Sequence, residues 1–353
     1  MLRVLFAGLG SIGQRHLRNL KTLLGDRVQV LAYRTRGSNF ILSEQLTIER
    51  DHGLEEQYGI QVFTDLEQAL AMTPDAVFVT NPSSLHISVA LAAARTGSHL
   101  FIEKPLSNNM EGVAELISLV EQNRLTACVG YQLRFHPAFQ QIQKWVSAGS
   151  IGRILAVRAE VGEYLPGYHT YEDYRNTYAA RGELGGGVVL SQIHELDYLY
   201  ALFGMPKRVF SLGGKVSNLE IDVEDLASSL LEYRHPDGRV LPVYLQQDYI
   251  QRPASRTCQM IGEKGKVVWD YHAGRLERFN EQGMTLDLLD FSNLPRNQLF
   301  LDELKHFLDC LDGKQQPVVS VREAGDSLII AGAIQESLMI GQPVTIEINT
   351  GSY

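Results

Sequence analysis

Apolar and polar positions follow a regular order over the first 130 residues. Short apolar runs with the length of strands are separated by amphipathic stretches in which apolar positions recur three or four residues apart. Strands that alternate with helices of about 10–15 residues are typical of βαβ units and predict a parallel sheet. The expected elements cover residues 2–7, 12–24, 28–33, 65–72, 75–80, 84–96, 98–102, 107–123 and 126–131. Between them, the polar segment from Thr35 to Gly59 has no clean period, and we expect a loop with a short helix there.

The pattern changes after a predicted helix over residues 137–148. Strand-like runs then follow one another with a single apolar helical segment among them, at 188–203, which predicts an open, mainly antiparallel sheet with helices packed on it. The runs lie at 154–164, 207–215, 226–234, 240–250, 256–261 and 266–271, and helical patterns at 297–311 and 321–338 close the chain. A chain of 353 residues suits two domains. We therefore expect an α/β protein, with a doubly wound parallel sheet over residues 1–130 and an α+β domain over residues 131–353.

Composition narrows the class of protein. The net charge is −9 and the chain has no run rich in Lys or Arg, so we expect no nucleic-acid partner. No apolar stretch reaches the ~18 residues of a membrane span, and Met1–Phe6 enters a strand without the pattern of an export signal. Cys128, Cys258 and Cys310 lie far apart and lack the spacing of a metal site or a disulfide framework, which predicts no metal and a cytoplasmic location.

A glycine-rich turn follows the first predicted strand. The stretch from Gly8 through Gly10, Ser11 and Ile12 to Gly13 has the G-x-G-x-x-G spacing, between a strand and a helix. In this motif the glycines allow a tight turn, close approach of the backbone to a pyrophosphate, and close helix–strand packing. The amides of the next helix would hold the pyrophosphate, aided by the helix dipole. The turn therefore predicts a dinucleotide site in a Rossmann domain, although a methyltransferase that binds S-adenosylmethionine is compatible with the same first strand and helix.

The end of the second strand bears on the choice of cofactor. An NAD site usually has an Asp or Glu there to accept a hydrogen bond from the ribose 2′-hydroxyl, whereas this chain has Arg34, followed by Arg36. Arg34 can pair with a 2′-phosphate, so NADP(H) is the favoured cofactor. If both arginines lie on a solvated loop instead, the site takes NAD(H).

Four further stretches line up with the glycine turn. They are TNPSSLH at 80–86, EKPLS at 103–107, GYQLRFHPAF at 130–139 and GGGVVLSQIHELD at 185–197. In this order the chain resembles the glucose-fructose oxidoreductase, inositol dehydrogenase and rhizopine-catabolism family, usually called Gfo/Idh/MocA, over nearly its whole length. The resemblance implies a sugar, sugar-nucleotide or cyclitol dehydrogenase, assembled as a homodimer or homotetramer, that uses a nicotinamide cofactor. The alternative, a methyltransferase, does not explain the stretch Glu103-Lys104-Pro105.

The resemblance also implies roles for single residues. Glu103, Lys104 and Pro105 would lie beside the nicotinamide ribose. His194 and Asp197 would lie on the first helix of the second domain. The dinucleotide cleft would be lined by Thr80, Asn81, Pro82 and His86.

Lys104 and His194 are the candidate catalytic residues. Hydride transfer to or from a carbinol carbon requires that the hydroxyl proton also move and that charge on the oxygen be stabilised. An ammonium group and an imidazole suit these tasks, and Ser191 falls on the same side of a helix as His194, with Asp197 near enough to orient the ring. The competing interpretations are that Lys104 only pairs with Glu103 and that His194 is a hydrogen-bonded core residue.

One departure from the family bears on this assignment. Family members commonly carry an Asp three or four residues before this histidine, where the chain has Leu190 and Ser191. A serine cannot serve as an anionic base at neutral pH. The departure keeps open a second hypothesis, a dinucleotide-binding sensor or scaffold without turnover.

Substrate contacts are expected from polar and aromatic residues at the end of the sixth strand and in the segment ahead of the glycine triplet at 185–187. Amide, guanidinium and aromatic groups suit a polyhydroxylated ring, and arginines also suit a phosphate. The tyrosines would otherwise pack the domain interface. Besides Ser191, His194 and Asp197, the candidates are Gln132, Arg134, Tyr164, Tyr174, Arg175, Tyr178 and Arg181.

Overall fold

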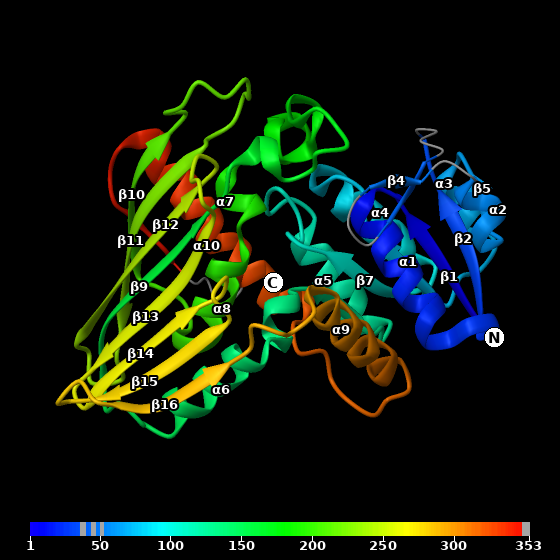
Figure 1. The fold of residues 1–353 in the computed structure, drawn as a ribbon. Coiled ribbons are helices and arrows are strands. Elements are labelled where there is room, and N and C mark those ends of the chain that lie inside the picture. The colour runs from blue at the N-terminus through cyan, green and yellow to red at the C-terminus, as the bar shows by residue number, and fades with distance from the viewer. Residues whose placement is uncertain (36–39, 44–46, 50–52, 348–353) are drawn as a thin grey trace.

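The protein was analysed as a computed structural model, which describes residues 1–35, 40–43, 47–49 and 53–347. Two large sheets lie at opposite ends of the molecule with helices between them (Figure 1). The first is a six-stranded parallel sheet of order β5-β2-β1-β6-β7-β8. Its strands are β1 (Leu2–Ala7), β2 (Val28–Tyr33), β5 (Gln61–Phe63), β6 (Ala76–Val79), β7 (His99–Glu103) and β8 (Ala127–Gly130). The strand order reverses between β1 and β6, the point at which open α/β sheets bind ligands.

Helices cover both faces of this Rossmann sheet, as the apolar pattern predicts. They are α1 (Ser11–Leu24), α2 (Leu54–Tyr58), α3 (Leu66–Leu70), α4 (His86–Arg95) and α5 (Val113–Gln122). A small two-stranded sheet, β3 (Ile41–Leu42) and β4 (Ile48–Glu49), lies in the region expected to be a loop. The helix predicted from residue 107 begins only at Val113, because Gly112 precedes it in the left-handed region, with φ of 75°.

The second sheet has nine strands in the order β16-β15-β14-β13-β9-β12-β11-β10-β17. All neighbours pair antiparallel except β9 and β12, which are parallel. This confirms the predicted fold class. The strands are β9 (Ile154–Gly162), β10 (Arg208–Gly214), β11 (Leu226–Arg234), β12 (Val240–Asp248), β13 (Ser255–Gly262), β14 (Gly265–Asp270), β15 (Arg275–Asn280), β16 (Thr285–Asp290) and β17 (Val344–Thr345).

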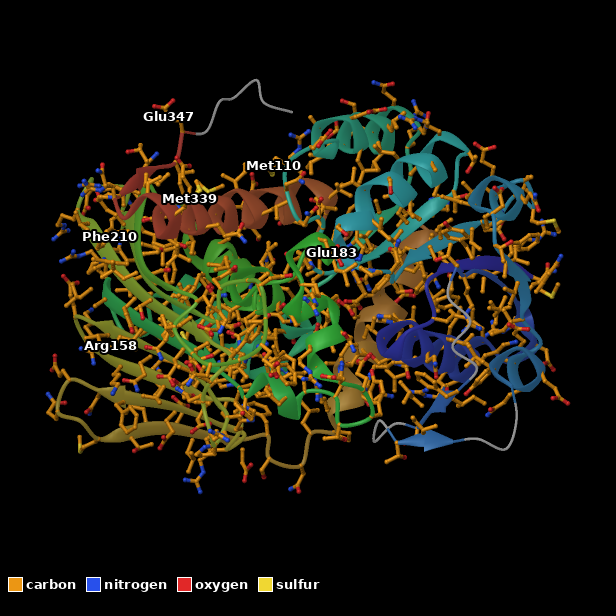
Figure 2. All side chains as sticks on the ribbon, turned by 90° about the horizontal axis from the view of Figure 1, so that it is seen from above. Met110, Arg158, Glu183, Phe210, Met339 and Glu347 are labelled. Atoms are coloured by element: carbon orange, nitrogen blue, oxygen red, sulfur yellow. The ribbon has the colours of Figure 1, made fainter. Side chains whose placement is uncertain are left out.

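Helices pack on the inner face of this sheet, on the side that faces the Rossmann sheet (Figure 1). They are α6 (Pro137–Ser147), α7 (Val188–Ser191), α8 (His194–Phe203) and α10 (Val321–Ile340). Short 3-10 helices complete the chain at η1 (Gly25–Arg27), η2 (Ser83–Leu85), η3 (Gln132–Phe135), η4 (Leu165–Gly167), η5 (Tyr174–Asn176), η6 (Tyr178–Ala180) and η7 (Gly182–Leu184). Side chains fill the space between the large sheet and the helices (Figure 2).

Helix α9 (Arg296–Leu311) returns to the Rossmann sheet from the far end of the chain. Its Phe307 ring lies 5.5 Å from the rings of both Phe78 and Phe101, and Asn297 hydrogen-bonds the side chains of Arg15 and Asn19 on α1. The apolar core of the Rossmann unit therefore includes residues from the C-terminal part of the chain. In the described residues, no helix is long and apolar enough to span a membrane.

Candidate active site

The glycine turn has the tight geometry that its motif predicts. Gly8 has φ of 100°, and a Cβ there would lie 2.9 Å from the Asn81 backbone. A Cβ on Gly13 would lie 2.5 Å from the Gly8 carbonyl oxygen. Neither position has room for a side chain, so the first and third glycines fix how closely β1, β6 and α1 approach one another.

The middle glycine has a different environment. A Cβ on Gly10 would meet no atom within 4 Å, so open space lies directly over this backbone. Gly10 precedes α1, whose N-terminus has no side-chain cap and no acidic residue in its first turn. The amides of Ser11 and Ile12 therefore begin a helix whose positive end is uncompensated by its own side chains, which fits a pyrophosphate.

The end of β6 forms the wall next to this turn. The Thr80 hydroxyl donates to the Gly8 carbonyl oxygen at 2.6 Å. Asn81 has a buried side-chain oxygen for which the described residues offer no hydrogen-bond partner, as expected of a group that awaits a ligand. Pro82 caps η2, and the His86 ring nitrogens lie 2.8 Å from the carbonyl oxygens of Asn81 and Pro105. His86 therefore ties the β6 loop to the β7 loop.

A tyrosine of the second domain reaches the glycine turn. Tyr171 forms a side-chain hydrogen bond with Ser11, and its ring centroid lies 6.1 Å from that of Phe40. The sequence did not identify Tyr171 as a site residue, because no motif around it distinguishes it from the other tyrosines of this segment.

Arg34 lies at the end of β2 and is buried. Its guanidinium forms an ion pair with Glu55 at 3.4 Å, and Glu55 is half exposed. The sequence predicts a cation, Arg34, at the end of β2. The structure adds the Glu55 carboxylate next to it. Arg36 lies outside the described residues.

Lys104 extends from the end of β7 toward the second domain. Its Nζ donates to the backbone carbonyl oxygen of Ser191, at 2.8 Å, at the end of α7. Glu103 lies 2.6 Å from His16 Nε2 on α1 through one carboxylate oxygen and accepts from the Lys104 backbone amide through the other. The Lys104 ammonium group therefore pairs with Ser191 and not with the Glu103 carboxylate. Glu103 instead connects the Lys104 backbone to α1 through His16.

His194 begins α8 close to Lys104. It is buried, and its Nδ1 has no hydrogen-bond partner in the described part of the chain. Burial lowers the pKa of His194 well below its usual range, and the charges of Lys104 and Arg256 lower it further. The structure thus brings a neutral imidazole and an ammonium group together at the junction of the two domains.

Asp197 does not orient His194. Both of its carboxylate oxygens accept from the Arg134 guanidinium, at 2.6 and 2.9 Å, in a buried ion pair. This pair joins η3 to α8 and occupies Arg134 as well. The structure therefore brings together Lys104, Ser191 and His194, while Arg134 and Asp197 hold each other.

Arg256 is a candidate that sequence reasoning missed. It pairs with the buried Glu195 at 2.9 Å and lies on β13 with Cys258, on the face that packs against the helices. The sequence did contain a signal for Arg256. It alternates with Cys258 and Met260 along the strand, which puts all three on the buried face. Its charge also acts on His272, whose pKa is lowered mainly by burial and further by Arg256.

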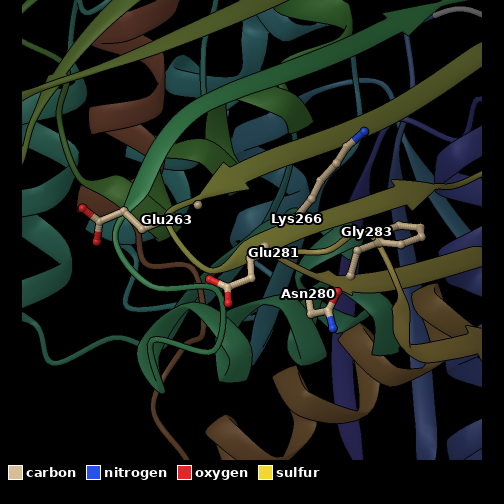
Figure 3. Close-up of a pocket in the computed structure, with 8 residues that line it drawn as sticks. Glu263, Lys266, Asn280, Glu281 and Gly283 are labelled. Atoms are coloured by element: carbon tan, nitrogen blue, oxygen red, sulfur yellow. The ribbon is translucent and has the colours of Figure 1, made fainter.

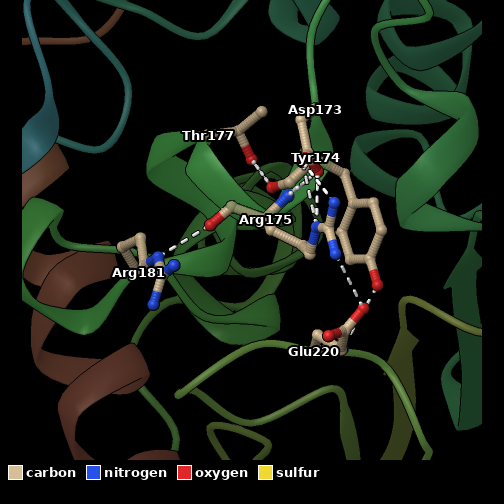
Figure 4. Close-up of polar contacts among 6 residues, drawn as sticks. All are labelled: Asp173, Tyr174, Arg175, Thr177, Arg181 and Glu220. Carbon is tan, nitrogen blue, oxygen red and sulfur yellow. Dashed lines mark hydrogen bonds and ion pairs between the residues drawn. The ribbon is translucent and has the colours of Figure 1, made fainter.

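The loop ahead of α7 holds half of the predicted substrate contacts. Arg175 pairs with Asp173 and Glu220, and the Arg181 Nε donates to the Arg175 carbonyl oxygen (Figure 4). Tyr174 accepts from the Glu220 amide through its hydroxyl, so these groups hold the loop to itself and to the segment before β11. The remaining candidates, Gln132, Tyr164 and Tyr178, are half-buried, and the Tyr164 ring lies 4.0 Å below the Arg252 guanidinium.

A shallow depression lies between the hairpin turns of the large sheet, next to Glu263, Lys266, Asn280 and Glu281 (Figure 3). It contains none of the residues assigned to the active site and lies on the exposed end of the strands. We assign no ligand to it.

A Rossmann sheet with a glycine turn after its first strand, together with a lysine and a histidine close to each other where the two sheets' helices meet, is typical of a nicotinamide-dependent oxidoreductase. The family described as "Oxidoreductase family, NAD-binding Rossmann fold" matches residues 2–131, and the GFO/IDH/MocA C-terminal domain matches residues 139–268. The chain belongs to the Gfo/Idh/MocA oxidoreductase family.

Relatives and solved structures cover almost the whole chain at low identity. Scyllo-inositol 2-dehydrogenase (NAD(+)) of Bacillus subtilis is 23% identical, with 98% of this chain and 97% of the relative covered. The aldose-aldose oxidoreductase of Caulobacter crescentus gives a TM-score of 0.78 at 22% identity, covering 98% and 99% of the two chains. The WlbA dehydrogenase of Bordetella pertussis, solved with NADH and UDP-GlcNAcA, gives 0.77 at 22% identity, covering 99% of each chain. These structures support the two-domain fold.

Proposed function

We propose that the protein interconverts a hydroxyl and a ketone on a sugar, sugar nucleotide or cyclitol, with a nicotinamide cofactor bound at the glycine turn. The observation that carries the proposal is the 2.8 Å contact from Lys104 to Ser191, which sets an ammonium group of the Rossmann unit against the end of α7, just before α8 begins at His194. The names of relatives, which include inositol dehydrogenases and an enzyme solved with a nucleotide sugar, support the substrate class.

The residues present fit the dinucleotide. The open space over Gly10, the uncapped start of α1 and the unpartnered Asn81 oxygen provide donors, an acceptor and room. Gly8, Gly10, Ser11, Ile12 and Gly13 would hold the pyrophosphate, with Thr80, Asn81 and Pro82 along the wall and Glu103, Lys104 and Pro105 near the reactive end. When bound, the nicotinamide ring would accept or donate the hydride.

The chain's own groups would handle the proton and the charge. In the oxidation direction, the Lys104 ammonium donates a hydrogen bond to the substrate oxygen and stabilises negative charge on it. The neutral His194 imidazole accepts the hydroxyl proton, and in reduction it returns that proton. Ser191 contributes its carbonyl oxygen, which accepts from Lys104 Nζ and orients the ammonium group.

For the substrate, Tyr164 with Arg252 and the half-buried Gln132 and Tyr178 would border the cleft, with Arg256 behind His194. Arg175, Tyr174 and Arg181 would shape the loop rather than touch the sugar, because their polar groups are engaged in the network of Figure 4.

NADP(H) is the proposed cofactor, with Arg34 as the ligand of the 2′-phosphate. The Arg34–Glu55 ion pair supports this, because a phosphate can exchange with a half-exposed carboxylate.

We also propose a homo-oligomer built on the outer face of the nine-stranded sheet, where Leu212, Leu230 and Leu288 are more than half exposed. The three free, buried cysteines support a reducing compartment, the cytoplasm.

A substrate screen tests the function. The protein is incubated with NAD(+) or NADP(+) and a panel of cyclitols, aldoses and nucleotide sugars, and reduced cofactor is followed by absorbance. Turnover on one class supports the proposal. Binding of reduced cofactor, seen by fluorescence, without turnover in either direction on any compound would instead favour the sensor.

A further inference from the structure

Two cysteines that are far apart in the sequence meet one histidine inside the molecule. Cys128 lies on β8, and His306 and Cys310 lie one turn apart on α9. The two sulfur atoms and one ring nitrogen all lie within 4.8 Å of one another, and all three residues are buried. The predicted absence of a metal site rested on sequence spacing, which did not show this cluster.

The separations suit tetrahedral coordination. Zn–S and Zn–N bonds of about 2.3 and 2.0–2.1 Å at tetrahedral angles put the sulfur and nitrogen roughly 3.6 Å apart. Cys310 Sγ lies 3.4 Å from His306 Nε2, and the Cys128 thiol hydrogen-bonds the Cys310 thiol. Little movement is needed to place one ion among the three atoms.

His306 is already held as metal-ligating histidines are. Its Nδ1 lies 2.8 Å from the Gln315 side-chain oxygen, which only accepts, so Nδ1 carries the proton. Nε2 accepts from the Val318 amide at 3.0 Å and lies 3.4 Å from Cys310 Sγ, so a metal ion bound at this nitrogen would replace the amide hydrogen bond. A carbonyl partner on the distal nitrogen fixes the tautomer and ring orientation that metal binding requires.

A buried acid lies on the same side of α9. Glu303 is one turn before His306, and neither of its carboxylate oxygens has a hydrogen-bond partner among the described residues. It is 3% exposed, and its charge acts on Cys128. Glu303 is thus a buried acid near the cluster, although it is not one of the three groups whose ligand atoms lie within 4.8 Å of one another.

We propose that Cys128, His306 and Cys310 form a zinc site that fastens α9 to the edge strand β8. Two thiolates balance the charge of the ion, and a water would complete the tetrahedron. The site would join the Rossmann unit to the returning C-terminal helix. It is separate from the glycine turn, Lys104 and His194, so its role would be structural rather than catalytic.

Zinc binding to the full-length protein tests the site. The reduced protein is treated with a chelator, desalted without oxygen and titrated with zinc in competition with a chromophoric chelator. About one zinc should bind per chain and raise the melting temperature. Cobalt(II) in place of zinc should give thiolate-to-metal charge-transfer absorption in the unmutated protein, a readout that does not depend on a variant that folds.

Variants localise the ion. Cys128→Ser and Cys310→Ser should each weaken zinc binding by at least about 10²-fold, and Gln315→Leu, at an exposed position, by about 10–100-fold. Cys258→Ser, which alters the third buried cysteine on β13, should bind like the unmutated chain. The proposal is overturned by no zinc above background, by equal binding in Cys258→Ser and Cys310→Ser, or by a cobalt spectrum without thiolate absorption.

Discussion

The Lys104 ammonium nitrogen lies 2.8 Å from the Ser191 carbonyl oxygen, a contact that crosses from the end of β7 to the end of α7. The lysine thereby reaches the second domain with its charge directed by a backbone acceptor. Its position depends on the fold of both domains rather than on a neighbouring acid.

Replacement of Lys104 by Met should lower kcat by about 10²–10⁴-fold, because the substrate oxygen loses its charged donor. Cofactor affinity, measured by fluorescence titration, should change only a few-fold, since the pyrophosphate contacts lie at the glycine turn. Lys266→Met on β14, outside the active site, is the matched control and should retain activity. Near-full turnover in Lys104→Met would remove this lysine from the chemistry.

The pH profile should show a neutral imidazole. The pKa of His194 is lowered well below its usual 6.5 by burial and by nearby positive charges. A base works only when unprotonated, so kcat/KM should stay level as pH falls through 6.5 and decline only at the more acidic pH set by the lowered pKa of His194. His194→Asn should lose this acid limb and about 10²–10⁴-fold in kcat. His235→Gln is the control, because it keeps a side-chain donor for the Ile154 carbonyl oxygen, and it should leave the pH profile unchanged. If the acid limb persists in His194→Asn, the limb belongs to another group.

Cofactor choice should depend on Arg34 and Glu55. Arg34→Ala should weaken NADPH binding by roughly 10-fold or more, in line with the loss of a charge-assisted pair, and affect NADH little. Glu55→Gln removes the competing carboxylate and should strengthen NADPH binding instead. Dissociation constants for both cofactors decide the matter, and equal losses for NADPH and NADH in Arg34→Ala would contradict the assignment of the 2′-phosphate to this residue.

Stability should depend on the Asp225 carboxylate below neutral pH. Burial opposes its ionisation, but donors from Ser217, Val216 and Lys215 outweigh burial and lower its pKa. Because the folded pKa is the lower one, the stabilisation is present above the unfolded value near 3.8 and is lost as pH falls through the folded value.

Asp225→Asn should accordingly reduce the free energy of unfolding at pH 7 by about 1–3 kcal/mol, because several donors lose the charged acceptor that the buried carboxylate provides. Denaturant titrations at several pH values should show the difference shrinking toward acid. Asp237→Asn, on an exposed turn, is the control and should show no resolvable change. A pH-independent difference would point to packing rather than charge.

Most of the architecture could be predicted from the sequence, because its elements are long and periodic. The runs at β1, β2 and β11 match their predicted bounds, and the glycine turn has the expected strand before it and helix after it. Strand β5 and the hairpin of β15 and β16 were missed. β5 has only three residues, and β15 carries Arg275 and Glu277 among half-exposed positions, so neither shows a clean alternation.

The active site was less predictable, because it depends on partners that sequence spacing does not reveal. Lys104 and His194 meet as the family resemblance implies, and their catalytic roles stay a prediction. The pairing of Asp197 with Arg134 and of Glu195 with Arg256 depends on which faces η3, α8 and β13 turn toward one another. Such pairings are tertiary contacts, and helical spacing alone favoured a different partner for Asp197.

The return of α9 has a consequence for how the protein is made. Residues 1–130 leave the ribosome long before Phe307, which later packs against Phe78 and Phe101. The apolar surface of the Rossmann unit around Phe78 and Phe101 therefore stays uncovered until α9 has been synthesised. Its completion is tied to translation beyond residue 307, and until then chaperones have a defined apolar surface to shield.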